Sequence, residues 1–460
     1  MYISSYSQLF TITSSIKAAA RRLIASGAGL ALLLNIPVAA AAQDQSITTP
    51  GPPYGSIGEL LTVGLTVNPE VRAAQAQWKA TLEIVPARRA LPDPTLGYVH
   101  YLQSVETRVG PQQAAVNLSQ RLPWFGKLRL EGRIAAGKAD AAYHQYAGTV
   151  QKVAAEIEDA YWDYLYLQKA IGITRQNVEL LRSWEAVALS KYITAQAGHP
   201  DIIKAQVEVL SLEDQLETLQ QRQRPLLERL SAAVGRPLTS EEVKIVPIPA
   251  FPPPAALDSL REEALLRNPG LLGSREIIGV SEVAVRRARL NYRPDLMLGG
   301  NIVLTGESRY PDMLPDPSES GRDALLFTVG ITLPLHRRKY RALEQSAKAE
   351  LNSARLTTVN VENRLKSRLE LVLFDLQDAA RKARLYEEAL IPRAEQSLLA
   401  SEKAYIAEKV DFLTLIESQR VLLNYQLSYQ KALANQASHR ARLHALLGRY
   451  PLSTTTVEEE

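Results

Sequence analysis

The chain has 460 residues and a formal net charge of only +4, and it contains no cysteine. The weak charge excludes the strong positive field that is typical of nucleic-acid-binding proteins. The lack of Cys excludes disulfides, thiolate metal sites, Cys nucleophiles and a lipidated N-terminal Cys. The length suits two or three ordinary domains or one large repeated domain.

Residues 1–42 have the pattern of a secretory signal peptide. Basic residues precede a mostly apolar stretch, 23–38, and the alanines at 40–42 offer a small-residue cleavage site. The alternative is a retained anchor helix, because the apolar stretch is almost long enough to span a membrane. The basic residues are Lys17, Arg21 and Arg22, and their removal from the formal +4 leaves about +1. An exported, nearly neutral chain without Cys fits the envelope of a Gram-negative bacterium.

The first half of the mature chain alternates helical and strand patterns. After a polar, Pro-rich linker, 43–56, the sequence predicts an amphipathic helix that the prolines after Ala90 end. Two strands follow, because apolar and polar side chains alternate there on either side of a short polar loop. Two long helices come next, separated by Gly198, His199, Pro200 and Asp201. The predicted ranges are a helix at 57–90, strands at 94–104 and 113–123, and helices at 127–197 and 202–234.

The helix predicted over 127–197 carries apolar residues seven positions apart, in two series. A seven-residue repeat indicates helices that pair in a left-handed supercoil instead of packing around a globular centre. One series is Ile157, Tyr164, Ile171 and Val178, and the other is Val153, Ala160, Leu167, Thr174 and Leu181.

A Pro-rich linker, 240–256, can form neither a helix nor a central strand, and after it the same order of patterns begins again. The ordered matches indicate an internal duplication, with one repeat over 57–239, a second over 257–452 and a tail over 453–460. Asn68-Pro69 returns as Asn268-Pro269, Leu122-Pro123 as Leu333-Pro334, Tyr161-Trp162-Asp163 as Phe374-Asp375, Tyr192 as Tyr405, Asp201 as Asp411, and Gly235-Arg236 as Gly448-Arg449.

The second repeat predicts strands at 295–305 and 324–335, followed by a helical run over 337–447 that turns at 410–413. Strands of this length cross a bilayer when they are tilted. A bilayer accepts strands only in a closed barrel, because open edges would leave backbone groups without hydrogen bonds. Four strands cannot close around a pore, so several copies of the chain are expected to contribute to one wall.

The chain resembles the TolC-type outer-membrane efflux proteins over 57–452. The resemblance rests on the duplicated layout and on three local sequences: Leu122-Pro123-Trp124-Phe125-Gly126-Lys127, the turn with Tyr405 and Asp411-Phe412-Leu413, and Ala445-Leu446-Leu447-Gly448. It implies a mainly α fold with a transmembrane β-barrel. Three copies would form a homotrimer with a twelve-stranded β-barrel in the outer membrane, continued by a periplasmic α-helical coiled-coil barrel.

The resemblance also implies a function. The chain would be the outer-membrane channel of a tripartite efflux system, which conducts drugs or metal ions passively from an inner-membrane pump and a periplasmic adaptor. It would contact outer-membrane lipid but no nucleic acid, would need no cofactor and would not be an enzyme. The mature chain has no GxSxG, P-loop or dinucleotide-binding motif that would favour an enzyme.

Several residues match the family's periplasmic gate. Asp411 matches an aspartate that helps to form a constriction ring, whereas a second family aspartate falls at Thr414. Glu408 stands where the family often has Gly and would supply the missing charge. Further polar groups would hold neighbouring hairpins together: Tyr405, Lys409 and Asp201. The alternative is that Asp201 and Asp411 only cap the helices that follow them.

Basic residues flank the predicted strands at the periplasmic edge. Positive charge at the start of a helix opposes the helix dipole, so these residues need another reason. One hypothesis is contact with anionic phospholipid headgroups, and the alternative is a solvated charged collar. The residues in question are Lys127, Arg129, Arg337 and Arg338.

Two other functions fit parts of the pattern. A channel for type I protein secretion shares the whole fold. A periplasmic coiled-coil adaptor also pairs long hairpins, but adaptors need a compact β module interrupted by the hairpin. Here strands of about ten residues recur in two widely separated pairs.

Overall fold

The computed structural model describes residues 56–194, 198–252, 254–309 and 317–452. The predicted signal peptide, 1–42, the predicted tail, 453–460, and almost all of the predicted linker, 43–56, lie outside these ranges.

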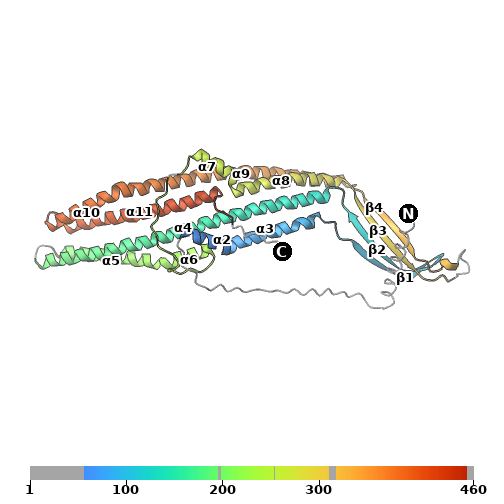
Figure 1. The fold of residues 1–460 in the computed structure, drawn as a ribbon, viewed down its shortest axis with the longest axis horizontal. Helices are drawn as coiled ribbons and strands as arrows, with labels where there is room; N and C mark the ends of the chain where they lie inside the picture. The colour runs from blue at the N-terminus through green and yellow to red at the C-terminus, as the bar shows by residue number, and fades with distance from the viewer. Residues whose placement is uncertain (1–55, 195–197, 253, 310–316, 453–460) are drawn as a thin grey trace, which may run out of the picture. The chain divides into compact units, whose positions relative to one another are not determined.

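In the first half of the chain, two strands come between two groups of helices in sequence order. In space, these helices all lie to the same side of the strands (Figure 1). The elements in order are α2 (Ile57–Val67), α3 (Pro69–Arg89), β1 (Thr95–Thr107), β2 (Gly110–Leu122), α4 (Lys127–Ile193), α5 (His199–Gln221) and α6 (Gln223–Val234).

The second half has the same order of helices, strands and helices. Its elements are α7 (Leu257–Arg267), α8 (Pro269–Arg289), the 3-10 turn η1 (Leu290–Tyr292), β3 (Asp295–Thr305), the 3-10 turn η3 (Pro317–Glu319), β4 (Ala324–Thr332), α9 (Arg337–Leu385), the π-turn η4 (Tyr386–Leu390), α10 (Ile391–Ile406) and α11 (Phe412–Leu446).

The helix predicted over 57–90 is two helices in the structure, because Asn68 ends α2 and begins α3. The side-chain oxygen of Asn68 accepts hydrogen bonds from two backbone N–H groups in the first turn of α3. Pro69 occupies the first position of α3, where its missing N–H is not needed. The Asn68 amide also donates to the carbonyl of Ala233, 2.8 Å away at the end of α6. One side chain thus caps a helix and ties it to the end of the same half.

The second half repeats this junction. Asn268 begins α8 by accepting a hydrogen bond from the N–H of Leu271, and its amide donates to the carbonyl of Leu446 at 2.9 Å. In both halves a glycine with positive φ follows the helix that receives the amide: Gly235 has φ 88° and Gly448 has φ 68°. The duplication seen in the sequence is therefore matched by equivalent contacts.

The four strands form one antiparallel sheet in the order β1-β2-β3-β4 among the described residues (Figure 1). β2 and β3 pair in the centre, with Leu122 opposite Leu296, while β1 and β4 lie at the two edges. Only Arg108 and Val109 separate β1 from β2, so the loop is much shorter than the one predicted between 104 and 113. The strand predicted over 324–335 ends at Thr332, whereas the strand predicted at 295–305 has the observed bounds.

The two faces of the sheet differ in chemistry. Leu96, Leu118, Gly300 and Phe327 lie side by side across the four strands, and this face is largely apolar. Its edge residues are exposed, with Leu96 of β1 71% and Leu325 and Phe327 of β4 each 74% exposed. The opposite face has polar or small residues on the central strands: Asn117, Ser119, Gly299 and Asn301. The alternation predicted for β4 is thus present in the structure.

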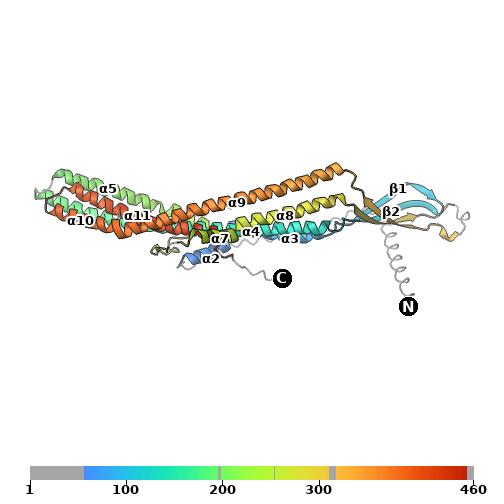
Figure 2. The same ribbon diagram turned by 90° about the horizontal axis from the view of Figure 1, so that it is seen from above.

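The long helices run side by side beyond the sheet, within 56–452 (Figures 1 and 2). α4 packs against α3 and α8 near the sheet, and against α5 and α11 farther away. All residues of both seven-residue series in α4 are buried, which confirms the prediction of paired helices. A core around Trp162 joins α4 to α2, α6 and α11, and a second core lies at the helical tips.

The break between α9 and α10 lies next to a proline. Pro392 lies in the first turn of α10, and the preceding turn, η4, is a π-helix, which widens the helix where the proline lacks an N–H. No helix among the described residues is both long and apolar enough to cross a membrane.

Candidate functional site: the helical tips and the strand-to-helix junction

The tips of the helices are built around two aromatic rings. Phe412, at the start of α11, is fully buried, and its ring centre lies 5.3 Å from that of Tyr405 near the end of α10. Trp184 and Ala188 of α4 belong to the same core. This packing fixes the turn between α10 and α11 and positions the polar residues around it.

Asp411 caps α11 and remains exposed. Its Oδ1 accepts a hydrogen bond from the hydroxyl of Thr414 at 2.6 Å and from the Thr414 N–H at 3.1 Å. These two bonds lower the pKa of Asp411, with the side-chain bond contributing most, so the carboxylate stays ionised at neutral pH. The prediction of a cap is confirmed for Asp411, and Thr414 proves to be the partner of the carboxylate it follows.

Asp201 does not cap α5, so the capping prediction is wrong for this residue. Gly198 is the N-cap residue and makes no side-chain bond, while Asp201 lies within the first turn of the helix. Its carboxylate lies 4.0 Å from the ammonium of Lys204. Its negative charge also acts on Tyr405: burial first, and then Asp201, raises the pKa of the Tyr405 phenol.

Glu408 is the single non-glycine residue with positive φ, 59°, among the described residues. Its N–H donates to the carbonyl of Tyr405, and the N–H of Lys409 donates to the carbonyl of Ala404. These two bonds end α10 in a Schellman motif, whose αL position usually holds glycine. The backbone at residue 408 therefore favours glycine, and Glu408 adopts this conformation in its place. Glu408 and Lys409 both point their side chains into solvent.

Lys191 is a tip residue that sequence reasoning missed. Its ammonium lies 4.7 Å from the centre of the Tyr405 ring and donates to the carbonyls of Tyr405 and Ile406 at 3.0 and 3.3 Å. The Tyr405 hydroxyl is buried without a hydrogen-bond partner among the described residues. A signal was present in the sequence, because Lys191 continues the buried stripe of Leu181, Trp184 and Ala188 with a charge.

A second interaction ties the hairpins together behind the tips. Arg420 of α11 binds both carboxylate oxygens of Glu208 of α5, and the Glu208 side chain is largely buried. The tips therefore bring Asp201, Tyr405 and Asp411 into one region, linked by Lys191, Lys204 and the pair of Arg420 with Glu208.

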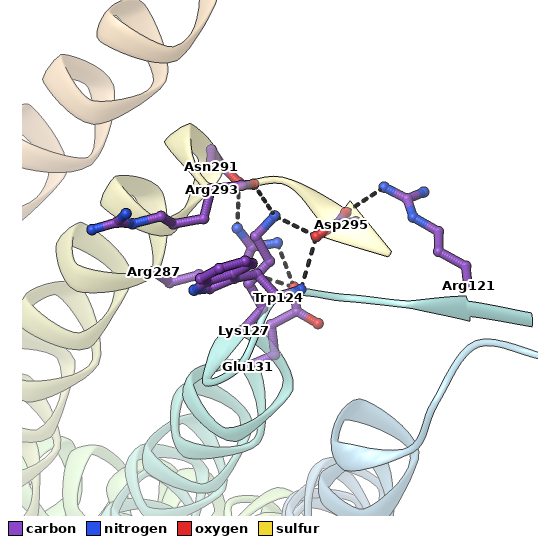
Figure 3. A network of polar contacts seen from close by, with 8 residues as sticks. All are labelled: Arg121, Trp124, Lys127, Glu131, Arg287, Asn291, Arg293 and Asp295. Atoms are coloured by element: carbon purple, nitrogen blue, oxygen red, sulfur yellow. Dashed lines mark hydrogen bonds and ion pairs between the residues drawn. The ribbon is translucent and has the colours of Figure 1, made fainter. Parts of the chain in front are cut away.

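The junction between strands and helices contains a buried ion pair (Figure 3). The Lys127 ammonium lies 2.7 Å from Asp295, and both side chains are 8% exposed. Asp295 also accepts hydrogen bonds from the guanidinium of Arg121 at 2.7 Å and from the N–H of Trp124 at 2.9 Å. Lys127 further donates to the carbonyl of Arg293.

This burial corrects the prediction for Lys127. Its ammonium is enclosed by protein and bonded to Asp295, so it cannot extend to a lipid headgroup. Glu131 and Arg287 form a second pair nearby, 2.6 Å apart, which links α4 to α8 (Figure 3). The other predicted rim residues are exposed and make no ion pair within the described ranges: Arg129, Arg337 and Arg338.

Residues 61–236 match the profile of the family described as Outer membrane efflux protein. The cobalt-zinc-cadmium resistance protein CzcC of Cupriavidus metallidurans is 22% identical over 437 residues, which cover 92% of this chain and 98% of CzcC.

Solved structures match the fold over most of the chain. A membrane protein from Pseudomonas aeruginosa matches with a TM-score of 0.73 at 17% identity, covering 86% of this chain and 92% of that one. The outer membrane protein VceC of Vibrio cholerae matches with a TM-score of 0.69 at 18% identity, covering 85% and 96%.

Proposed function

Because the chain belongs to the outer membrane efflux protein family, we propose that three copies of it form a channel across the outer membrane of a Gram-negative bacterium. The channel conducts small substrates passively, and an inner-membrane pump supplies the energy through a periplasmic adaptor. The observation that carries the proposal is the sheet, which has two free edges and one exposed apolar face.

The free edges support closure with other copies. β1 and β4 each present unpaired backbone groups on one side within the described chain. Such edges are unstable in a bilayer, where water cannot satisfy them, and a closed barrel removes them. Three copies of a four-stranded sheet give about twelve strands, within the range of outer-membrane barrels.

The faces of the sheet support the same arrangement. Exposed side chains such as Leu96, Phe327 and Val329 suit contact with lipid, and the face with Asn117 and Asn301 suits a water-filled lumen. The helices on the same chain then extend the wall into the periplasm. This division between faces argues against a periplasmic adaptor, whose β module would bury its apolar side.

The tips are the proposed periplasmic gate. A threefold axis brings the exposed Asp411 carboxylates of three copies near one another, and their ionised state makes a ring that attracts cations. Glu408 and Lys409 are exposed beside this ring and are proposed to contact neighbouring copies. Asp201 is proposed to contribute through Lys204, and Tyr405 through its packing.

The exposed cations at the junction have a separate proposed role. Arg129 and Arg337 have no ion-pair partner in the described chain and lie next to the ends of β2 and β4. They are proposed to contact anionic headgroups at the periplasmic surface of the outer membrane. A drug or a metal ion is the proposed substrate, and the name of CzcC favours metal ions. A channel for type I protein secretion is the second candidate, because it uses the same fold.

Charge substitutions on the two faces of β4 test the placement in the membrane. Phe327→Asp puts a carboxylate on the apolar face, and we expect it to abolish assembly in the outer membrane. The matched control is Thr328→Asp, which puts the same charge on the neighbouring residue of the opposite face and should assemble. Equal assembly of the two variants, measured by membrane fractionation and heat-modifiable migration, would contradict the proposal.

A further inference from the structure

The junction between β2 and β3 provides a template for contacts between neighbouring strands. Lys127 begins α4 just after β2, and Asp295 begins β3. Their side chains form the buried pair at 2.7 Å (Figure 3). Two adjacent strands are thus clamped where one leaves the sheet for a helix and the other enters it.

The sequence pattern that leads into β3 occurs again at the start of β1. The pattern Pro-Asp-x-x-Leu-Gly occurs at 294–299, where it begins β3, and at 92–97, where it begins β1. Asp93 is therefore the counterpart of Asp295. It lies just before the edge strand β1 instead of before a central strand.

The sequence leaving β2 has a copy at the end of the sheet. Lys127 follows Pro123 by four residues, and Arg338 follows Pro334 by four residues. Each proline comes after a leucine, which is the last residue of β2 in the first case and the residue after β4 in the second. Arg338 is therefore the counterpart of Lys127. It lies in the first turn of α9, the helix that follows the edge strand β4.

Both counterparts lack the partner that the template predicts. Asp93 and Arg338 are exposed, and neither forms an ion pair with any residue that the structure describes. They lie at opposite edges of the sheet, so they cannot meet within one chain. Their charges are complementary, and a second copy of the chain would bring the two edges together.

The strand register agrees with this pairing. In the template, Leu122 is opposite Leu296, and their counterparts are Leu333 and Pro94. An antiparallel pair continued from there puts Val329 opposite Tyr98. Both residues belong to the exposed apolar face, Val329 with 62% and Tyr98 with 57% exposure. A register shifted by one residue would pair the apolar face of one strand with the polar face of the other. The register taken from the repeated sequences and the register required by the chemistry of the faces therefore agree.

We propose that Asp93 of one copy forms an ion pair with Arg338 of the next copy, at the junction where β1 of the first copy pairs with β4 of the second. The inference rests on the proposed trimeric channel and specifies its subunit contact. It removes Arg338 from the residues that face lipid. In the template, Asp295 binds both Arg121 and Lys127. The counterpart of Arg121 is Thr332, which carries no charge, so Arg338 alone supplies the cation for Asp93.

Cysteine cross-linking tests the register, because the natural chain has no Cys. The double variant Tyr98→Cys with Val329→Cys should form covalent dimers and trimers under mild oxidation, because directly opposite strand residues lie within disulfide range. The control pair is Val99→Cys with Val329→Cys, which places one thiol on the other face and should stay monomeric under denaturing electrophoresis.

Charge reversal tests the ion pair. Asp93→Arg and Arg338→Asp should each speed dissociation of the detergent-solubilised trimer by about tenfold or more, and the double exchange should restore most of the loss. Arg337→Asp is the matched control, with the same charge change one residue away and a much smaller expected effect. Equal effects of Arg337→Asp and Arg338→Asp, without rescue in the double exchange, would overturn the ion pair.

The two proposals fail differently. If the wild-type trimer conducts, while Tyr98→Cys with Val329→Cys forms no cross-link and Asp93→Arg with Arg338→Asp shows no rescue, the inference is overturned and the channel stays in place. A wild-type protein that is monomeric and never conducts would overturn the channel, and the subunit contact with it.

Discussion

Lys191 makes two contacts with Tyr405 at the end of α10: its ammonium lies 4.7 Å from the centre of the ring and 3.0 Å from the carbonyl oxygen of that residue. Lys191 belongs to α4, so this contact joins the two hairpins of the duplicated fold at their tips. A cation enclosed in this way satisfies the carbonyls that the helix end leaves free.

Replacement of Lys191 with Met should loosen the tip. The apolar length is kept, but the cation–π contact and the charged hydrogen bonds are lost, so amide hydrogen exchange around 405–411 should accelerate by about tenfold. Lys403→Met is the matched control, because Lys403 is exposed on α10. Equal exchange rates in the two variants would remove Lys191 from the support of the tip.

Tyr405→Phe should leave the stability nearly unchanged. The hydroxyl is buried without a partner in the described chain, so its loss removes no hydrogen bond there and should shift the free energy of unfolding by less than about 1 kcal/mol. A marked rise in the open probability of the channel would instead assign the hydroxyl to a bond between copies. Thermal unfolding and single-channel recording together separate these outcomes.

Substitutions of Asp411 separate its charge from its capping role. Asn also caps helices, so Asp411→Asn should reduce the preference for cations while the melting temperature stays close to that of the wild type. Asp411→Ala removes both the charge and the bonds to Thr414, and should lower both selectivity and melting temperature. Unchanged reversal potentials in both variants would place Asp411 away from the pore axis.

Gly235 and Gly448 should resist substitution even by alanine. A Cβ at Gly235 would come within 2.6 Å of the Cα of Asn68, and one at Gly448 within 2.8 Å of the carbonyl oxygen of Arg267. With positive φ at both sites, each change should cost about 1–3 kcal/mol. Gly172→Ala is the control, because a Cβ there meets nothing within 4 Å and should be neutral or stabilising. Thermal unfolding followed by circular dichroism measures all three.

Protonation of His444, near the end of α11, should lower the free energy of unfolding in acid. Burial, followed by the charges of Arg440 and Arg449, lowers the pKa of His444 to about 4 from an ordinary 6.5. Between these values the unfolded chain binds a proton that the folded chain does not, so stability falls as the pH falls. The loss should reach about 3 kcal/mol at pH 4 and level off within about one pH unit below it. In His444→Gln this part of the pH dependence should disappear from denaturant titrations, and an unchanged profile would contradict the assignment.

Much of the fold could be predicted from the sequence because its signals are periodic. Alternation gave the strands to within a few residues, and the seven-residue series identified side chains such as Ile157 and Leu167 that the structure buries. The break at Asn68 was missed because a cap followed by proline was included in a continuous helical pattern, although the same pair marks the start of α8.

The candidate site could be predicted less well, because its contacts join distant parts of the chain. Lys127 was assigned to a lipid-facing rim, yet it is buried and forms an ion pair with Asp295 from the other half of the chain. The contact of Lys191 with Tyr405 also crosses the two halves. Asp201 was expected to cap a helix, but its place within the first turn depends on where α5 begins, and residue spacing fixes such a boundary poorly.

The central claim is that three copies of this chain form a conducting pore. Single-channel recording of the detergent-purified protein in planar bilayers, with its mass measured in the same detergent, tests this most directly. The account predicts steady conductance steps from a trimeric species. A monomeric protein that remains in solution and produces no steps would contradict it and favour the periplasmic adaptor.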